Sequence, residues 1–109
     1  MSQSKLLTTI AGITFAAISL SSGTTMAADG AALYQAKTCF ACHGMDAKTP
    51  ITPLYPKLAG QNKDYALNQM KDIKSGARNN GQTGAMRGIM GMVNETEMAA
   101  IAEWLSSLK

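Results

Sequence analysis

The chain has 109 residues, of which 46% are apolar and 16% are charged, and its formal net charge is +3. No tract is compositionally extreme, and so weak a positive charge excludes a nucleic-acid-binding surface. A chain of this length forms one small domain, whose core is marginal without a disulfide, a metal or a cofactor.

The first segment has the layout of a secretory signal peptide. One cation, Lys5, precedes a nearly uncharged apolar run between Leu6 and Leu20, and small residues follow it up to Ala27. We expect residues 1–27 to be removed and residues 28–109 to form a single domain in the periplasm. An uncleaved anchor is the alternative, but a membrane span needs about 20 predominantly apolar residues, and this run is shorter.

The exported part begins with a predicted short helix over Asp29–Ala36. Asp29 is a plausible N-cap, because its carboxylate can accept hydrogen bonds from the first backbone N–H groups. Two cysteines follow, at Cys39 and Cys42. All three prolines then lie between residues 44 and 60, where they deny a helix its hydrogen bonds. The sequence therefore predicts a loop there.

Two further helices are predicted in the second half of the chain. Apolar residues at helical spacing favour a helix over Asp64–Lys74, which Gly76 ends. Asn94 and Glu97 form a capping box before the closing helix, whose apolar residues also recur at helical spacing. Residues 77–92 contain four glycines, and we predict irregular chain there. No segment alternates like a strand, so the predicted fold class is all-α.

The pentapeptide from Cys39 to His43 carries the chemistry. Cys-x-x-Cys-His is the attachment signature of haem c, in which two thioethers bind the porphyrin and the histidine ligates the iron. A thioredoxin-like dithiol would need a βαβ context. Zinc would need further ligands, and His43 is the only histidine. A disulfide between Cys39 and Cys42 without any cofactor is the remaining alternative.

Haem iron prefers a second axial ligand, and the chain offers methionine or lysine for this position unless it is left open. Met45 follows His43 too closely to reach the opposite haem face. Met70 and Met98 are expected to fill the core from their helices. The remaining candidates are the methionines of the glycine-rich segment, Met86, Met90 and Met92.

The flanking segments resemble the class I c-type cytochromes, especially small bacterial mono-haem proteins and single units of the tandem di-haem cytochromes. Gly30–Tyr34 is similar to the first helix of that family, and Tyr65–Gly76 to its central helix. Tyr55–Gln61 contains its Pro-x-Leu-x-Gly-Gln motif, and Ile101–Leu105 resembles its closing helix. One departure is Trp104, where the family commonly has Tyr or Phe. The single Cys-x-x-Cys-His argues against a di-haem chain.

The resemblance implies a class I cytochrome c fold over residues 28–109, with three to four helices wrapped around one covalently bound haem. Gly30 and Trp104 would mark the crossing of the first and last helices. The Pro56 carbonyl would accept the Nδ1 proton of His43. Met86 would be the second iron ligand, because its spacing from Trp104 matches the family pattern.

These features predict a one-electron carrier rather than an enzyme, since a buried, six-coordinate haem rearranges little on reduction. Its partners would be donor and acceptor redox proteins, with no small-molecule substrate and with membrane contact only through partner complexes. One alternative is a haem subunit of a larger dehydrogenase or oxidase complex. Another is a haem enzyme or gas sensor, which would need an open iron site and a distal acid or base.

Overall fold

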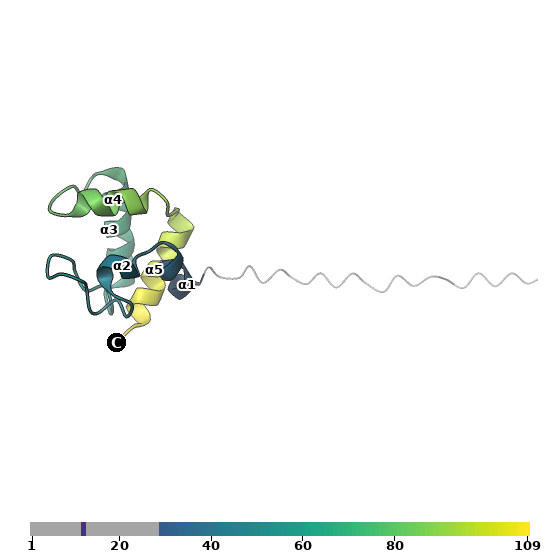
Figure 1. The fold of residues 1–109 in the computed structure, drawn as a ribbon. Coiled ribbons are helices and arrows are strands. Elements are labelled where there is room, and N and C mark those ends of the chain that lie inside the picture. The colour runs from purple at the N-terminus through teal and green to yellow at the C-terminus, as the bar shows by residue number, and fades with distance from the viewer. Residues whose placement is uncertain (1–11, 13–28) are drawn as a thin grey trace, which may run out of the picture.

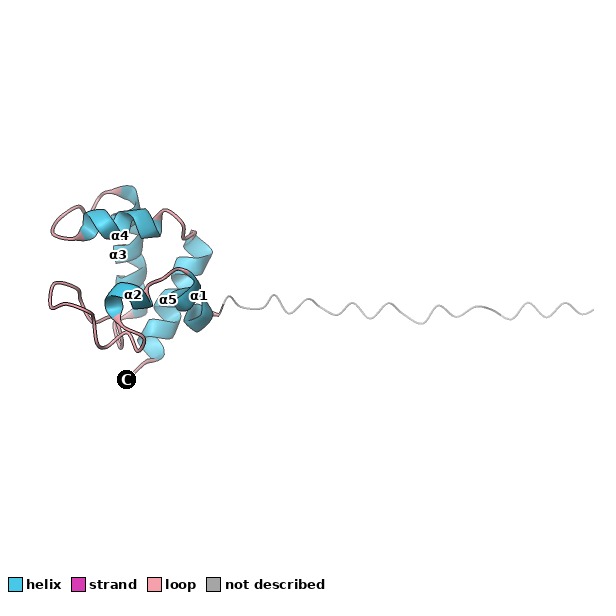
Figure 2. Cartoon of the chain, viewed as in Figure 1, coloured by secondary structure: helices cyan, strands magenta, loops and turns pink. Residues whose placement is uncertain are grey.

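The computed structural model describes residues 29–109 and Gly12 (Figure 1). Apart from Gly12, the expected signal peptide lies outside these residues. The helices are α1 (Gly30–Ala36), α2 (Phe40–His43), α3 (Lys63–Ser75), α4 (Thr83–Met90) and α5 (Glu95–Ser107). No strand forms within this part of the chain, which confirms the all-α prediction (Figure 2). None of its helices is long and apolar enough to cross a bilayer.

Side-chain caps begin the three helices that the sequence predicts. Asp29 Oδ1 accepts from the Ala31 backbone N–H at 3.0 Å at the start of α1. The capping box of α5 is complete, because Asn94 and Glu97 each accept from the other's backbone N–H. Asn62 caps α3, a residue that the sequence analysis did not single out. Both α3 and α5 therefore begin within about one residue of their predicted starts.

The prediction of irregular chain over residues 77–92 is wrong for Thr83–Met90, where α4 forms. Met86 and Met90 lie one helical turn apart and face the interior of the protein. Added Cβ atoms at Gly84 and Gly88 would contact nothing within 4 Å, so these glycines lie on the open side of the helix. Burial of one apolar face outweighs the low helix propensity of the glycines.

The first and last helices cross at Gly30, as expected from the resemblance. A Cβ added at Gly30 would lie 2.2 Å from the Ala100 carbonyl oxygen and 2.6 Å from the Trp104 Cβ. Next to this crossing, the rings of Tyr34 and Trp104 pack with centroids 4.9 Å apart. The backbones can approach this closely only because residue 30 has no side chain.

Substituting Gly30 with alanine is expected to lower the free energy of unfolding by about 2 kcal/mol, because the methyl group forces α1 away from α5. Chemical denaturation of the holo-protein, followed by circular dichroism, measures this change. Gly84→Ala is the matched control, since a Cβ added at Gly84 meets no atom within 4 Å. This substitution within α4 should leave the stability unchanged or raise it slightly. Equal stability of the two variants would contradict this account of the crossing.

The buried side chains surround a single interior region between α1, α3 and α5. The closing helix supplies Met98, Ile101, Ala102 and Leu105, and α3 supplies Met70 and Ile73. Met98 is fully buried, as predicted for a core residue. Met70 is also buried, but it faces a cavity.

Candidate functional site

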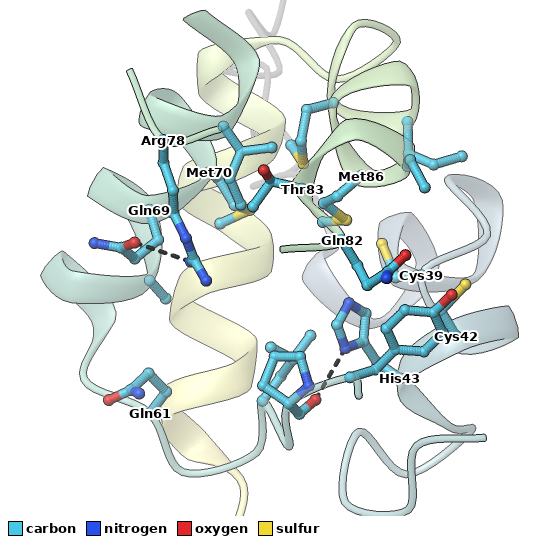
Figure 3. Close-up of a pocket in the computed structure, with 18 of the residues that line it drawn as sticks. Cys39, Cys42, His43, Gln61, Gln69, Met70, Arg78, Gln82, Thr83 and Met86 are labelled. Carbon is cyan, nitrogen blue, oxygen red and sulfur yellow. Dashed lines mark hydrogen bonds between the residues drawn. The ribbon is translucent and has the colours of Figure 1, made fainter. Parts of the chain in front are cut away.

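A cavity of about 560 Å³ lies between α3, α4 and the cysteine segment, and most of its walls are apolar. Its lining includes every residue that the sequence analysis assigned to the site: Cys39, Cys42, His43, Pro56 and Met86 (Figure 3). These residues come from three separate stretches of the chain. The fold therefore brings the candidate site residues together around one space.

The cysteine segment forms the single helical turn α2. The backbone N–H of His43 donates to the Cys39 carbonyl at 3.0 Å, which fixes the spacing of the two cysteines. No disulfide joins Cys39, which is buried, to Cys42, which is exposed. Burial raises the pKa of the Cys39 thiol. Both sulfur atoms are thus available at one edge of the cavity.

His43 is buried, and a loop proline orients its imidazole. Its Nδ1 atom lies 3.0 Å from the Pro56 carbonyl oxygen. Since a carbonyl can only accept, Nδ1 carries the proton and the lone pair of Nε2 remains for a metal. Burial lowers the pKa of His43, which favours the neutral ring, while the Pro56 carbonyl acts in the opposite direction.

Tyr34 fixes the chain just after His43. Its hydroxyl donates to the Gly44 carbonyl at 2.6 Å in a fully buried position. Gly44 has φ +89, a conformation that favours glycine, and an added Cβ would lie 2.2 Å from the Thr49 carbonyl oxygen. The sequence analysis did not assign Tyr34 to the site, because nothing in the sequence pairs it with Gly44.

Tyr34→Phe is expected to lower the free energy of unfolding by about 1–2 kcal/mol, because the buried Gly44 carbonyl loses its donor. Burial raises the pKa of Tyr34 from 10.0 to about 12, so the folded state keeps the phenolic proton longer than the unfolded state. This stabilisation is complete below about pH 10 and is lost as the pH rises towards about 12. The stabilities of wild type and variant should therefore converge across that window, and a constant gap would contradict the proposed cause.

The methionines separate clearly by their position relative to the cavity. Met70, Met86 and Met90 line it. Met45 and Met92 are 66% and 59% exposed and do not line it. Figure 3 shows Met86 reaching into the cavity from α4, while His43 enters from the opposite wall. Two donor atoms, a thioether sulfur and an imidazole nitrogen, therefore face the same space from two sides.

The charged side chains that line the cavity are Lys57 and Arg78, and no Asp or Glu is among its described lining residues. Arg78 Nη1 donates to Gln69 Oε1 at 3.0 Å. Figure 3 shows this pair on the α3 side of the cavity, away from the cysteines. The sequence analysis missed both residues, because neither belongs to a motif and only the fold brings them together.

The shape and the lining of the cavity fit a haem in several respects. Two thiols lie at one edge, where thioether bonds to vinyl groups would form, and nitrogen and sulfur donors face each other across the interior. The carboxylates of haem lie on the edge away from its vinyl groups, and the cation of Arg78 lies on the matching side of the cavity. The apolar walls suit the faces of a porphyrin.

Comparisons with known proteins agree with this geometry. The sequence model of the family described as cytochrome c matches residues 27–109. The chain is 31% identical over 93 residues to cytochrome c-553 of Nitratidesulfovibrio vulgaris, covering 85% of this chain and 89% of the relative. It is 43% identical over 89 residues to cytochrome c4 of Pseudomonas aeruginosa, covering 80% of this chain.

The matched relatives differ greatly in length. The chain spans 42% of the Pseudomonas aeruginosa cytochrome c4 and 45% of the cytochrome c4 of Azotobacter vinelandii. It also spans 40% of a protein named thiosulfate dehydrogenase electron acceptor from Stutzerimonas stutzeri, with 35% identity over 89 residues. The chain therefore spans less than half the length of each of these three relatives.

Proposed function

Because this chain belongs to the cytochrome c family, we propose that it is a periplasmic one-electron carrier whose haem iron is ligated by His43 and Met86. The class I cytochrome c fold predicted from the sequence is confirmed by the family match and by the helical structure. The family match also establishes haem c as the cofactor and electron transfer as its general role. The location and the ligand pair are our proposals.

The observation that carries the ligand assignment is the opposed placement of His43 and Met86 across the cavity. When bound, haem supplies an iron that changes its charge by one unit. Cys39 and Cys42 would hold it covalently, and the Pro56 carbonyl would keep the His43 ring in one tautomer. With haem bound, the apolar walls would limit the access of water, and little around the iron would have to rearrange during electron transfer.

The same cavity argues against catalysis or gas sensing. His43 is the only histidine of the chain, so no second imidazole can serve as a distal base. None of the described residues that line the cavity is an Asp or Glu. Histidine and the carboxylates are the side chains that most often perform general acid–base chemistry on a bound ligand. We therefore favour the electron carrier over the enzyme.

The ferrous protein is expected to resist carbon monoxide at neutral pH, because His43 and Met86 fill both axial positions. The test adds the gas to reduced protein and follows the Soret band. A slow and incomplete change supports two-sided ligation. A prompt change at low gas concentration would mean an open iron, and the enzyme or sensor would then be the better proposal.

A second candidate is a haem subunit of a larger dehydrogenase or oxidase complex. It is favoured by the name that two relatives share, thiosulfate dehydrogenase electron acceptor; they are 35% and 34% identical to this chain. In either role the partners are redox proteins, and the iron chemistry is the same. Purification from native periplasm and membranes distinguishes them, since a subunit co-purifies with its complex and a free carrier elutes alone.

A further inference from the structure

We propose that Lys37 and Lys74 are positioning residues that hold Met86 at the iron by locking the connection between α4 and α5. This inference rests on the proposed Met86 ligation and extends it. The two ammonium groups come from different parts of the fold and donate to consecutive backbone carbonyls. Lys37 Nζ lies 3.0 Å from the Met92 oxygen, and Lys74 Nζ lies 2.6 Å from the Val93 oxygen.

The connection is continuous with the last turn of α4. The backbone N–H of Gly91 donates to the Arg87 carbonyl at 3.0 Å, and that of Val93 donates to the Met90 carbonyl at 3.1 Å. Met86 lies one helical turn before Met90, on the same face of α4. Val93 is itself buried and lines the cavity. Any shift of the connection would therefore move the wall that carries Met86.

The charges favour both lysines at this place. The C-terminal end of α4 carries partial negative charge, which an ammonium group complements. The adjoining N-terminal end of α5 would repel a cation, but Glu97 offsets this repulsion with an ion pair of 3.3 Å to Lys37. The Asn94 N–H and the Lys37 ammonium hold the pKa of Glu97 below its ordinary value.

The two lysine contacts matter because α4 has little rigidity of its own. It spans 8 residues, and Gly84 and Gly88 lie in its interior. A helix this short depends on tertiary contacts for its stability, and residues behind a metal ligand determine how firmly the ligand is presented. Lys37 ties the end of α4 to the end of α1, and Lys74 ties it to the last turn of α3.

Imidazole uptake by the ferric holo-protein tests the proposal, because imidazole can take the axial position only when Met86 leaves it. Lys74→Met and Lys37→Met are each expected to bind imidazole about tenfold faster than wild type, which corresponds to about 1.4 kcal/mol. Both lysines keep part of their side chains in solvent, so methionine should not prevent folding. Circular dichroism of each variant checks this point.

Lys63→Met is the matched control, because Lys63 also belongs to α3 and forms an ion pair of 3.9 Å with Glu103. It should react within about twofold of the wild-type rate, since an exposed pair contributes little. Lys74→Arg keeps a cationic donor and should also stay close to wild type. The proposal is overturned if Lys74→Met and Lys37→Met react no faster than Lys63→Met, or if Lys74→Arg reacts as fast as Lys74→Met.

The near-infrared absorption band of ferric methionine–haem ligation separates this proposal from the ligand assignment. If Met86→Ala retains the band, the proposed function is wrong about Met86, whatever the lysine variants do. If Met86→Ala loses the band while the lysine variants match Lys63→Met, only the lock is wrong. If Lys37 and Lys74 hold Met86 in place, the band should be weaker in Lys74→Met and Lys37→Met. It should be unchanged in Lys63→Met.

Discussion

Replacing both Cys39 and Cys42 by alanine is expected to leave almost no folded protein in the periplasm. Without thioether bonds the haem is not retained, and the cavity of about 560 Å³ lies in the middle of the only core that the described residues form. Without haem, the apolar side chains around this space lack packing partners. A small domain has a total stability of only about 5–15 kcal/mol, so this loss of packing is expected to prevent stable folding.

Immunoblotting and a pyridine haemochrome assay of the periplasmic fraction measure this prediction, with protein and haem each compared with wild type. Met45→Ala is a suitable control, because Met45 is exposed and lies outside the cavity. It should accumulate as holo-protein at close to the wild-type level. Recovery of a folded, haem-free double variant at wild-type yield would show that the chain does not depend on its cofactor for folding.

Met86→Ala is expected to remove the near-infrared band of the ferric protein and to open the iron to carbon monoxide after reduction. The reduction potential should also fall by about 0.1 V or more, within the span of about 0.8 V that axial ligands control. The reason is that a thioether stabilises ferrous iron more than water does. Absorption spectra of both oxidation states and a potentiometric titration measure the three changes.

Two variants serve as controls for Met86. Met92→Ala alters an exposed side chain outside the cavity and should leave the band, the potential and the carbon monoxide response intact. Met90→Leu keeps the volume of a buried residue that lines the cavity, so it should fold normally and retain the band. If Met86→Ala kept the band and Met90→Leu lost it, Met90 would be the ligand instead.

The sequence predicted the elements whose signals are local. Asp29 and the Asn94–Glu97 pair cap helices within three residues of themselves, and such caps act through neighbouring backbone groups. The pentapeptide from Cys39 to His43 is likewise a local signal for haem attachment, although the single turn that it forms was not predicted. The family resemblance added the close approach of Gly30 to α5 and the contact between His43 and Pro56, which local patterns alone do not contain.

The parts that the sequence did not predict depend on contacts between distant segments. Helix α4 forms because Met90 is buried and Met86 is partly buried against other elements. Its glycines have low helix propensity, so the sequence of this segment alone does not predict a helix. The Arg78–Gln69 contact joins the chain after α3 back to that helix. The Lys37 contact with Met92 spans 55 residues. No periodicity or motif marks such pairs, so they appear only once the chain is folded.

A potentiometric titration of the purified holo-protein, followed by its visible absorption, tests the electron-carrier account most directly. We predict a single reversible transition that takes up one electron per chain, and a ferrous spectrum that does not change promptly when carbon monoxide is added. Several transitions within one chain, uptake of a different number of electrons, or a ferrous form that binds the gas at once would contradict a single haem held by His43 and Met86.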